Sequence, residues 1–427
     1  MSHALGPKAL SNILALYSVH FFGYIFPLVT VPYTVRVLSP SGYGIGVFAQ
    51  SSVGFFGILA NYAFAFTATR AIAANRADSA AVAKIVTEVI STKVLMLGLS
   101  GALYAVLIAF WSKLHYDPRV MWGAFLSMAA LSLSPAWLYQ GLEEMRFPSR
   151  VTIVCQVLYL PALFIFVRHP SDTWKWLALM AASAGAATVI LWWNAFRKFR
   201  LRLVCPRLLG IRVQLREGFH LFVSQAAVSF YTVANTFILG ALTNATIAGY
   251  YGAAERVVLA VFSLLGPIQR AIYPRAAHLA AASDKDATLR LTGYMFLIVG
   301  LVGALMSAGL LVGAPVIVRI VLGIKFLPSI TIMRILSPLP FLVALSNVLG
   351  VQIMIPFRKD RAFTVVLLAA GILNLGLGSL LALRWAGQGM ATSVAITETV
   401  VTASMMWYVK RCHLFTLGSL FGRGRDV

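Results

Sequence analysis

The stretch KIVTEVISTKVLMLGLSGALYAVLIAF, residues 84–110, decides the fold class. From Val94 to Phe110 it holds no charged residue, and a helix needs only about 20 mostly apolar residues to cross the hydrocarbon core of a membrane. The whole chain agrees, with 60% apolar residues, 11% charged residues and a mean hydropathy of +0.84. In a soluble protein about a quarter of the residues are charged, because they must wet its surface. The sequence therefore predicts an all-α integral membrane protein.

Apolar runs of this length recur along the chain. We count about 12 transmembrane helices, within a range of roughly 11 to 14, since each span needs about 20 residues. Their expected positions are residues 10–35, 44–69, 84–110, 120–142, 149–168, 174–196, 217–242, 248–275, 288–312, 328–355, 362–384 and 388–409.

The longest polar connection, residues 197–216, is strongly basic and divides the helices six and six. Such a segment is typical of an amphipathic linker on the inner leaflet. The predicted organisation is an N-terminal lobe (1–196), this cytoplasmic linker (197–216), a C-terminal lobe (217–409) and a cytoplasmic tail (410–427).

The basic residues predict how the chain is oriented. With the N-terminus inside, about 24 lysines and arginines lie in inner segments and about eight in outer loops. The positive-inside rule then places both termini in the cytoplasm. It also explains the net charge of +22 as contact with anionic lipid head groups. We therefore expect membrane lipid as a partner, and no nucleic acid.

Motifs for a cofactor or for catalysis are missing from the sequence. The three cysteines, Cys155, Cys205 and Cys412, form no CxxC pair and cannot all join in disulfides. No phosphate-binding loop of the type GxxxxGK[ST] is present, so energy would come from an ion gradient, the membrane potential or the substrate's own gradient. We expect no cofactor, no metal and no enzymatic activity. The first apolar segment follows Met1–Lys8 without a small-residue cleavage site, so we expect it to remain as a helix.

Four stretches carry a resemblance to a known transporter family. They are VPYTVRVLSP (31–40) with Gly42–Gly44; WLYQGLEEMR (137–146); Leu215–Phe219 with Ser229–Thr232, Asn235, Leu239 and Gly240; and Gly249–Tyr251 with Ala253–Arg256 and Pro267–Arg275. In this order and spacing they resemble the polysaccharide flippases of the multidrug/oligosaccharidyl-lipid/polysaccharide transporter superfamily. The last hundred or so residues carry none of these stretches.

The resemblance implies a specific architecture and activity. It implies two six-helix lobes around a central cavity, in the inner (cytoplasmic) membrane of a bacterium. It implies that a lipid-linked oligosaccharide, attached through a diphosphate to a polyprenol such as undecaprenol, moves from the cytoplasmic to the outer leaflet by alternating access. The family serves O-antigen, capsule and exopolysaccharide synthesis, so a polysaccharide polymerase and a chain-length protein are expected partners. We expect a monomer, because the path would lie inside one chain.

Basic residues inside the membrane are the predicted contacts of the diphosphate. An anionic head group cannot cross hydrocarbon bare, and arginine or lysine side chains could replace its water. The predicted substrate-binding residues are Lys93, Arg256, Arg270, Arg36 and Arg334.

Each of these residues also has a structural alternative. Lys93 lies roughly 14 Å deep at 1.5 Å per residue, and could instead snorkel or pair with Glu88, five residues before it. Arg256 and Arg270 are about four helical turns apart and so share one face of their helix. Alternatively, Arg256 pairs with a neighbouring charge and Arg270 anchors the inner interface. Arg36 could fix the first outer turn.

Three carboxylates are predicted to couple transport to an ion. A carboxylate inside a membrane is costly unless it holds a proton or a cation, so Glu398, Glu255 and Glu88 are candidates for H+ or Na+ coupling. Glu398 could instead be the structural partner of an internal arginine. Intramembrane amides could bond sugar hydroxyls or bridge helices, and these are Asn61, Gln140, Gln225, Asn235 and Asn347.

Two other functions remain open from the sequence. A small-molecule or multidrug exporter of the same superfamily would have the same helices, but cationic drugs would favour an acidic cavity. An integral-membrane polymerase or glycosyltransferase usually needs a sizeable polar outer loop, whereas the outer loops here are short. The flippase is the preferred hypothesis.

Overall fold

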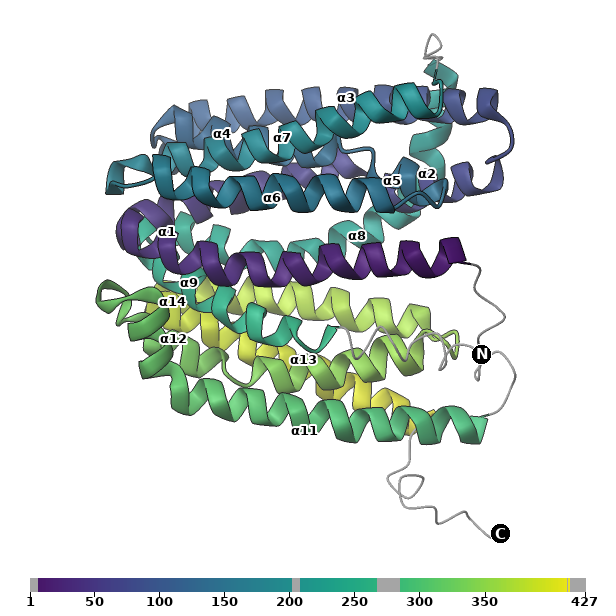
Figure 1. Ribbon diagram of the computed structural model, residues 1–427. Coiled ribbons are helices and arrows are strands. Elements are labelled where there is room, and N and C mark those ends of the chain that lie inside the picture. Colours follow the sequence, from purple (N-terminus) through teal and green to yellow (C-terminus); the bar gives the residue numbers. More distant parts are fainter. Residues whose placement is uncertain (1–6, 202–207, 267–284, 413, 415–427) are drawn as a thin grey trace, which may run out of the picture. The chain divides into compact units, whose positions relative to one another are not determined.

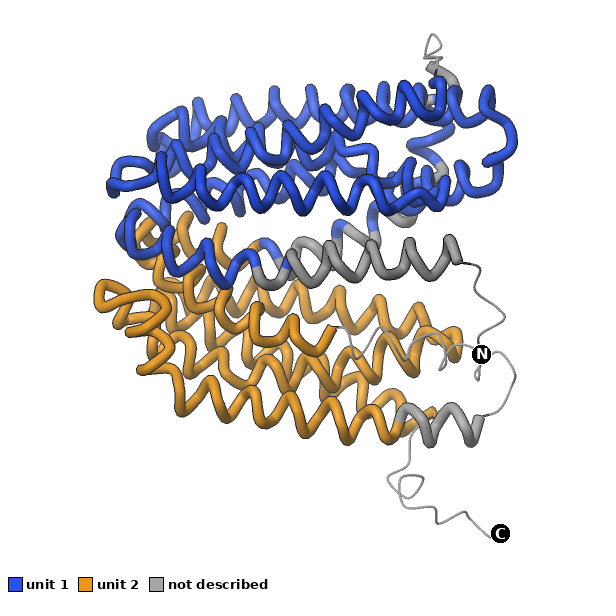
Figure 2. Tube along the Cα trace, viewed as in Figure 1, with its two compact units in different colours: residues 1–233 blue, residues 234–427 orange. Residues whose placement is uncertain are grey.

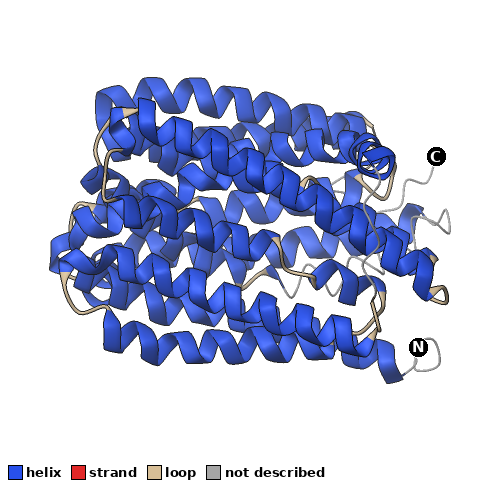
Figure 3. Cartoon of the chain, turned by 90° about the horizontal axis from the view of Figure 1, so that it is seen from above, coloured by secondary structure: helices blue, strands red, loops and turns tan. Residues whose placement is uncertain are grey.

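The computed structural model describes residues 7–201, 208–266, 285–412 and 414 (Figure 1). Throughout these ranges the regular elements are helices, and no strand is present (Figure 3). The chain divides into two compact units, residues 1–233 and 234–427, and the boundary falls inside the helix α8 (Figure 2). The lobe boundaries expected from the basic segment 197–216 stay a prediction, and residues 202–207 of that segment lie outside the described residues.

Unit 1 contains seven helices and most of an eighth. They are α1 (Pro7–Asn61), α2 (Phe64–Ala74), α3 (Ser79–Phe110), α4 (Pro118–Ser132), α5 (Ala136–Gly141), α6 (Arg146–Phe166), α7 (Thr173–Lys198) and the first part of α8 (Leu208–Leu242), with short 3-10 turns at Ser112–Leu114 and Pro170–Asp172. Within α1 the backbone of Ser39 is non-helical (φ 63°, ψ 167°), so α1 is two helices joined at a kink.

Unit 2 holds the remaining described elements. They are the end of α8, α9 (Ala245–Ser263), α11 (Lys285–Ile317), the π-helix Val318–Leu322, a 3-10 turn at Ile324–Phe326, α12 (Ser329–Leu336), α13 (Leu339–Asn347), the π-helix Val348–Met354 and α14 (Asp360–Arg411). The backbone is non-helical at Trp385 and Ala386, so α14 is also two helices. Just beyond this kink, a Cβ added to Gly389 would overlap the carbonyl oxygen of Leu381, so only glycine fits there.

The exposed side chains show where the lipid lies. Eight helical segments in the described ranges are long and apolar enough to cross a membrane by length and composition. Only 17% of the most apolar window of α3 is buried, against 61% for the segment Ser329–Met354. Large apolar side chains such as Phe110 (86% exposed) and Val312 (79% exposed) would face water in a soluble protein, which is unfavourable at this scale. These faces fit hydrocarbon instead.

Each of the twelve expected spans overlaps a helical element in its described part, although residues 267–275 of the span 248–275 lie outside the described residues. The predicted all-α membrane fold is confirmed. Several of the expected helices are broken, however. Tyr62-Ala63 separates α1 from α2, Leu133-Ser134-Pro135 separates α4 from α5, and Ser337-Pro338 separates α12 from α13. Proline has no N–H to donate and its ring clashes with the preceding turn, so α4 and α12 each stop there. A helix break at a Ser-Pro pair therefore occurs in each unit.

Candidate functional site

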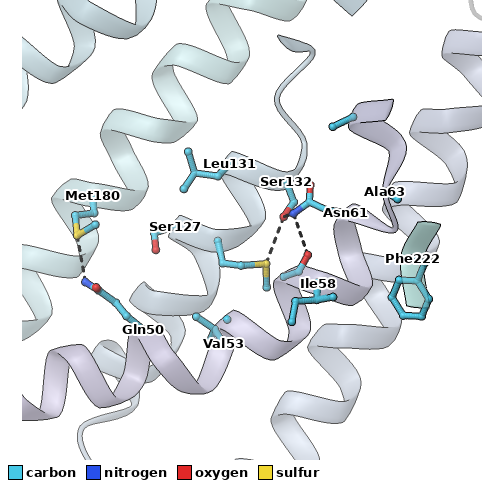
Figure 4. A pocket seen from close by; sticks show the side chains of 14 residues that line it. Gln50, Val53, Ile58, Asn61, Ala63, Ser127, Leu131, Ser132, Met180 and Phe222 are labelled. Carbon is cyan, nitrogen blue, oxygen red and sulfur yellow. Dashed lines mark hydrogen bonds between the residues drawn. The ribbon is translucent and has the colours of Figure 1, made fainter. Parts of the chain in front are cut away.

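A cavity of about 520 Å³ lies inside unit 1 (Figure 4). Its walls come from the second half of α1 and from α2, α4, α7 and α8. The lining residues are Gln50, Val53, Gly54, Gly57, Ile58, Asn61, Ala63, Ala65, Ser127, Met128, Leu131, Ser132, Met180 and Phe222. A cavity of this size with an apolar wall and a few polar groups is typical of small-ligand sites.

The polar groups of this pocket are all uncharged. Gln50 points its amide nitrogen at the sulfur of Met180 over 3.4 Å, as Figure 4 shows. Asn61 donates from Nδ2 to the hydroxyl of Ser132 (3.1 Å) and to the carbonyl of Gly57 (2.9 Å). Amides and hydroxyls both donate and accept, so the lining can bond the hydroxyls of a sugar. No carboxylate lies among the lining residues.

Two of the lining residues stand at helix ends. Asn61 is the last residue of α1, and the next two residues, Tyr62 and Ala63, have left-handed backbones (φ 40° and 60°). Ser132 is the last residue of α4, before the break at Leu133-Ser134-Pro135. The C-terminal ends of two helices therefore meet at the pocket, and such ends carry partial negative charge on their free carbonyls.

Lys93 is the charged side chain that reaches both helix ends. It lies on α3 and is only 5% exposed. Its ammonium donates to the carbonyl oxygen of Ser132 over 2.6 Å and lies 3.5 Å from Oδ1 of Asn61. None of the four ion pairs found among the described residues joins Lys93 to Glu88. Lys93 stands behind the pocket wall, in contact with two residues that form it.

A buried polar network crosses unit 2. The carboxylate of Glu255 on α9 accepts from the hydroxyls of Tyr251 (2.9 Å) and Thr236 (3.2 Å). Next to Thr236 on α8, Asn235 accepts at Oδ1 from Nδ2 of Asn374 on α14 over 2.7 Å.

The network continues along α14. The hydroxyl of Ser393 lies 3.1 Å from Oδ1 of Asn374, and that of Thr397 lies 3.5 Å from the same oxygen. Asn374, Ser393 and Thr397 are fully buried. The network thus joins α8, α9 and both halves of α14.

Glu398 follows Thr397 and is 9% exposed. Among the described residues its carboxylate has no hydrogen-bond or ion-pair partner, so the suggested arginine partner is not seen there. No group of three or more histidine, cysteine, aspartate or glutamate side chains in the described ranges could hold a metal ion. Unit 2 therefore offers one networked carboxylate, Glu255, and one solitary carboxylate, Glu398.

The other predicted site residues are scattered. Arg36 and Arg334 are exposed, at the end of the first half of α1 and in the last turn of α12. Arg256 is half-buried and follows Glu255, with which it interacts electrostatically. Arg270 lies outside the described residues, so its shared face with Arg256 stays a prediction. Glu88 is half-buried on α3, beside Gly210 of α8.

Several residues of these two sites were not singled out from the sequence. They are Gln50, Ser127, Ser132, Thr236, Tyr251, Asn374, Ser393 and Thr397. Serine and threonine can bond their own helix inside a membrane, so their presence in an apolar run carries little signal. Asn374 had a usable signal, because an amide inside the apolar run GILNLGLG needs a partner in hydrocarbon.

Comparison with known proteins places the chain among proteins of polysaccharide biosynthesis. The sequence matches the family described as "Polysaccharide biosynthesis protein" over residues 9–280. It is 30% identical to the "Putative O-antigen transporter" of Escherichia coli (strain K12) over 399 residues, which cover 93% of this chain and 96% of that relative. The protein of the same name from Shigella dysenteriae is 27% identical over 402 residues, 93% of this chain and 99% of the relative.

Solved structures of transporters share the fold. "Lipid II flippase MurJ, inward closed conformation" aligns with a TM-score of 0.71 over 96% of this chain and 89% of that chain, at 13% identity. The inward-facing conformation of a multidrug resistance MATE family transporter of the MOP superfamily gives 0.64 over 92% and 98%, also at 13% identity. Likeness at this identity concerns the fold alone. Together with the family match, it confirms the resemblance read from the four sequence stretches.

Proposed function

The chain belongs to the polysaccharide biosynthesis protein family, and from this membership we propose that it is a lipid-linked oligosaccharide flippase. It moves oligosaccharides joined through a diphosphate to a polyprenol from the cytoplasmic to the outer leaflet by alternating access. The observation that carries the proposal is the unit 1 pocket, with its uncharged amides and hydroxyls in an otherwise apolar wall. Neutral groups that donate and accept suit sugars, and aliphatic and aromatic walls suit their apolar faces.

The second candidate is a multidrug exporter, because the chain shares its fold with a multidrug resistance MATE family transporter. Exporters of cationic drugs need a carboxylate at the drug, since a buried cation must be paired. The fourteen lining residues include no carboxylate, and the charge that stands behind them, Lys93, is positive. The pocket therefore favours a neutral or anionic substrate over a cationic one.

Coupling to an ion is assigned in this proposal to the carboxylates of unit 2. An unpaired carboxylate in hydrocarbon is costly unless it takes up a proton or a cation, and Glu398 lacks a partner among the described residues. Glu255 is held by Tyr251 and Thr236, so it is part of the network that a protonation event would rearrange. A single buried carboxylate such as Glu398 can take up a proton or help to hold a sodium ion, and the proposal covers both.

The inner membrane, with both termini in the cytoplasm, is the proposed location. The positive-inside rule assigns the α2–α3 and α5–α6 connections and the end of α7 to the inner side. Two ion pairs join these three places, Arg76 with Glu143 (2.7 Å) and Lys198 with Glu144 (2.9 Å), so they lie at one end of unit 1. We propose that the protein acts as a monomer and not as an enzyme, and that it delivers its product to a polysaccharide polymerase and a chain-length protein.

The test is deletion of the gene in its native host, followed by analysis of surface polysaccharide and of lipid-linked intermediates. A flippase predicts loss of the polysaccharide and accumulation of the lipid-linked units on the inner leaflet. Purified protein in liposomes should then expose a labelled lipid-linked oligosaccharide to a lectin added outside. Normal polysaccharide after deletion, in a host without a second flippase, would exclude the function. Extrusion of a cationic dye by the same liposomes would favour the exporter.

A further inference from the structure

We propose that Lys93 is a positioning residue that ties two helix ends together at the unit 1 pocket, and that it does not itself bind the substrate's diphosphate. The inference rests on the proposed function only in taking this pocket as the substrate site. Its structural part, the tie between α1 and α4, stands on the contacts of Lys93 alone. It differs from the sequence-based expectation of a direct phosphate contact at this residue, and experiment can separate the two.

The break between α4 and α5 exposes backbone carbonyls that must find donors inside the membrane. Side chains from other helices supply three of them. Thr188 donates to the carbonyl of Ala130 (2.8 Å), Lys93 to that of Ser132 (2.6 Å) and the indole of Trp192 to that of Leu133 (2.9 Å).

The two remaining carbonyls bond to local backbone N–H groups. That of Ala129 accepts from Leu133 (3.0 Å), and that of Leu131 accepts from Ser134 (3.2 Å). Every carbonyl from Ala129 to Leu133 is therefore satisfied. Among the described residues Lys93 alone donates to the carbonyl of Ser132, so it has a defined structural role at this break.

Lys93 also joins this break to the end of α1. Its ammonium lies 3.5 Å from Oδ1 of Asn61, while Nδ2 of Asn61 bonds the hydroxyl of Ser132. The three residues close a triangle of contacts across α1, α3 and α4. An ammonium has three donors and no acceptor, so one lysine can serve both acceptors at once. Its positive charge is also favourable beside two helix C-termini.

Unit 2 provides an internal comparison, because the Leu-Ser-Pro sequence also marks the end of α12, and no lysine among the described residues bonds the backbone there. The hydroxyl of Ser337 bonds the carbonyl of Arg334 (2.7 Å). On α11, Ser307 accepts from the backbone N–H of Phe341 (3.2 Å). Neutral side chains can thus satisfy such a break. Lys93 in unit 1 makes one contact beyond the carbonyl at the break, which is its second contact, with Asn61.

The charge of Lys93 is already engaged by these acceptors. Lys93 is also only 5% exposed and is not among the residues that line the pocket, so a diphosphate in the pocket would meet Asn61 and Ser132 before it met the ammonium. The geometry instead lets the lysine fix Asn61 and Ser132, whose polar groups face the pocket. Side chains held this way recognise a ligand with less loss of conformational freedom on binding.

The experiment is hydrogen–deuterium exchange of the full-length protein in lipid nanodiscs without substrate, so it does not depend on the proposed function. Lys93→Met should accelerate exchange about tenfold or more in both segments 58–64 and 130–136, because one charge-assisted hydrogen bond is lost at their junction. Thr188→Val should accelerate only segment 130–136. Lys84→Met, an exposed lysine on the same helix, should change neither. Lys93→Arg, which keeps charge and donors, should restore most of the protection.

Transport measurements complete the test. Lys93→Met should raise the apparent KM for a lipid-linked oligosaccharide, and Lys93→Arg should bring it back toward the wild-type value. If Lys93→Met does not yield a monodisperse protein, Asn61→Leu removes the tie from the other side. It should then accelerate exchange in segment 58–64 while segment 130–136 stays protected. Unchanged exchange in segment 58–64 in Lys93→Met or Asn61→Leu would overturn the proposal and leave the direct phosphate contact in its place.

Discussion

Asn374 and Asn235 join the two ends of the polar network in unit 2, with Nδ2 of Asn374 lying 2.7 Å from Oδ1 of Asn235. One amide belongs to the first half of α14 and the other to α8. Because the oxygen of Asn374 faces the hydroxyls of Ser393 and Thr397 at the same time, a single residue connects α8 with both halves of α14. Any movement of one half of α14 relative to α8 must break or exchange these bonds.

The first prediction concerns this residue. Asn374→Leu should lower the free energy of unfolding by about 1–3 kcal/mol, because buried amide and hydroxyl groups lose their partner. The measurement is thermal unfolding in detergent. Ser379→Ala is the matched control on the same helix half, since its hydroxyl bonds only the carbonyl of Leu375 in its own helix, and it should change stability by less than about 0.5 kcal/mol. Equal melting temperatures for Asn374→Leu and the wild type would show that the network is not structural.

The second prediction concerns coupling at Glu398. Glu398→Gln keeps the shape of the protonated side chain but cannot release a proton. We expect exchange of labelled substrate between liposome leaflets to persist, while its acceleration by an imposed pH gradient is lost. Glu144→Gln, at an exposed ion pair with Lys198, should keep the acceleration. A full response to the pH gradient in Glu398→Gln would move the coupling role to Glu255, to be tested by Glu255→Gln in the same assay.

The third prediction concerns the lining of the unit 1 pocket. Ser127→Ala and Gln50→Leu each remove the hydrogen-bonding group of a lining side chain, and each should raise the apparent KM for a lipid-linked oligosaccharide about five- to tenfold. Leu131→Met, an apolar exchange in the same wall, should leave KM within about twofold. If the polar and apolar exchanges have the same effect, hydrogen bonding to the glycan does not occur at this wall.

The fourth prediction concerns the kink in α14. Gly389→Ala should destabilise the protein by several kcal/mol or prevent its accumulation in the membrane, because the new methyl group would overlap the backbone carbonyl of Leu381. Gly376→Ala lies in the first half of the same helix with no atom within 4 Å of the added Cβ. It should be neutral or stabilise by up to about 1 kcal/mol, as expected for alanine in a helix interior. Membrane levels and melting temperatures of the two variants would decide.

The membrane spans were predictable because long apolar runs in the sequence indicate which segments can lie in hydrocarbon. The break at Leu133-Ser134-Pro135 was not, since an average over about 20 residues passes over so short an interruption. Lys93 is 5% exposed, but neither Ser132 nor Asn61 was named as its partner. Glu88, five residues away on a helix of 3.6 residues per turn, points to a different face.

The uncharged members of both sites could not be found by the same reasoning. A charged residue in an apolar run can be recognised from the sequence alone. The roles of Ser132, Thr236 and Thr397 depend instead on which residues of other helical segments contact them. The sequence separation is 19 between Thr236 and Glu255, 23 between Thr397 and Asn374, and 39 between Ser132 and Lys93. One sequence without its relatives does not contain such pairings in readable form.

The interrupted helix in unit 1 has a consequence for biosynthesis. The carbonyls of Ala130 and Leu133 rely on Thr188 and Trp192, which are made more than 50 residues later, as their sequence separations of 58 and 59 show. When α4 leaves the ribosome these two carbonyls have no donor, and hydrocarbon does not supply one. The segment must wait as a continuous helix, or at the insertion machinery, until α7 arrives. Maturation of unit 1 is therefore tied to completion of α7, and a chain truncated before Thr188 would present an unfinished α4 to membrane quality control.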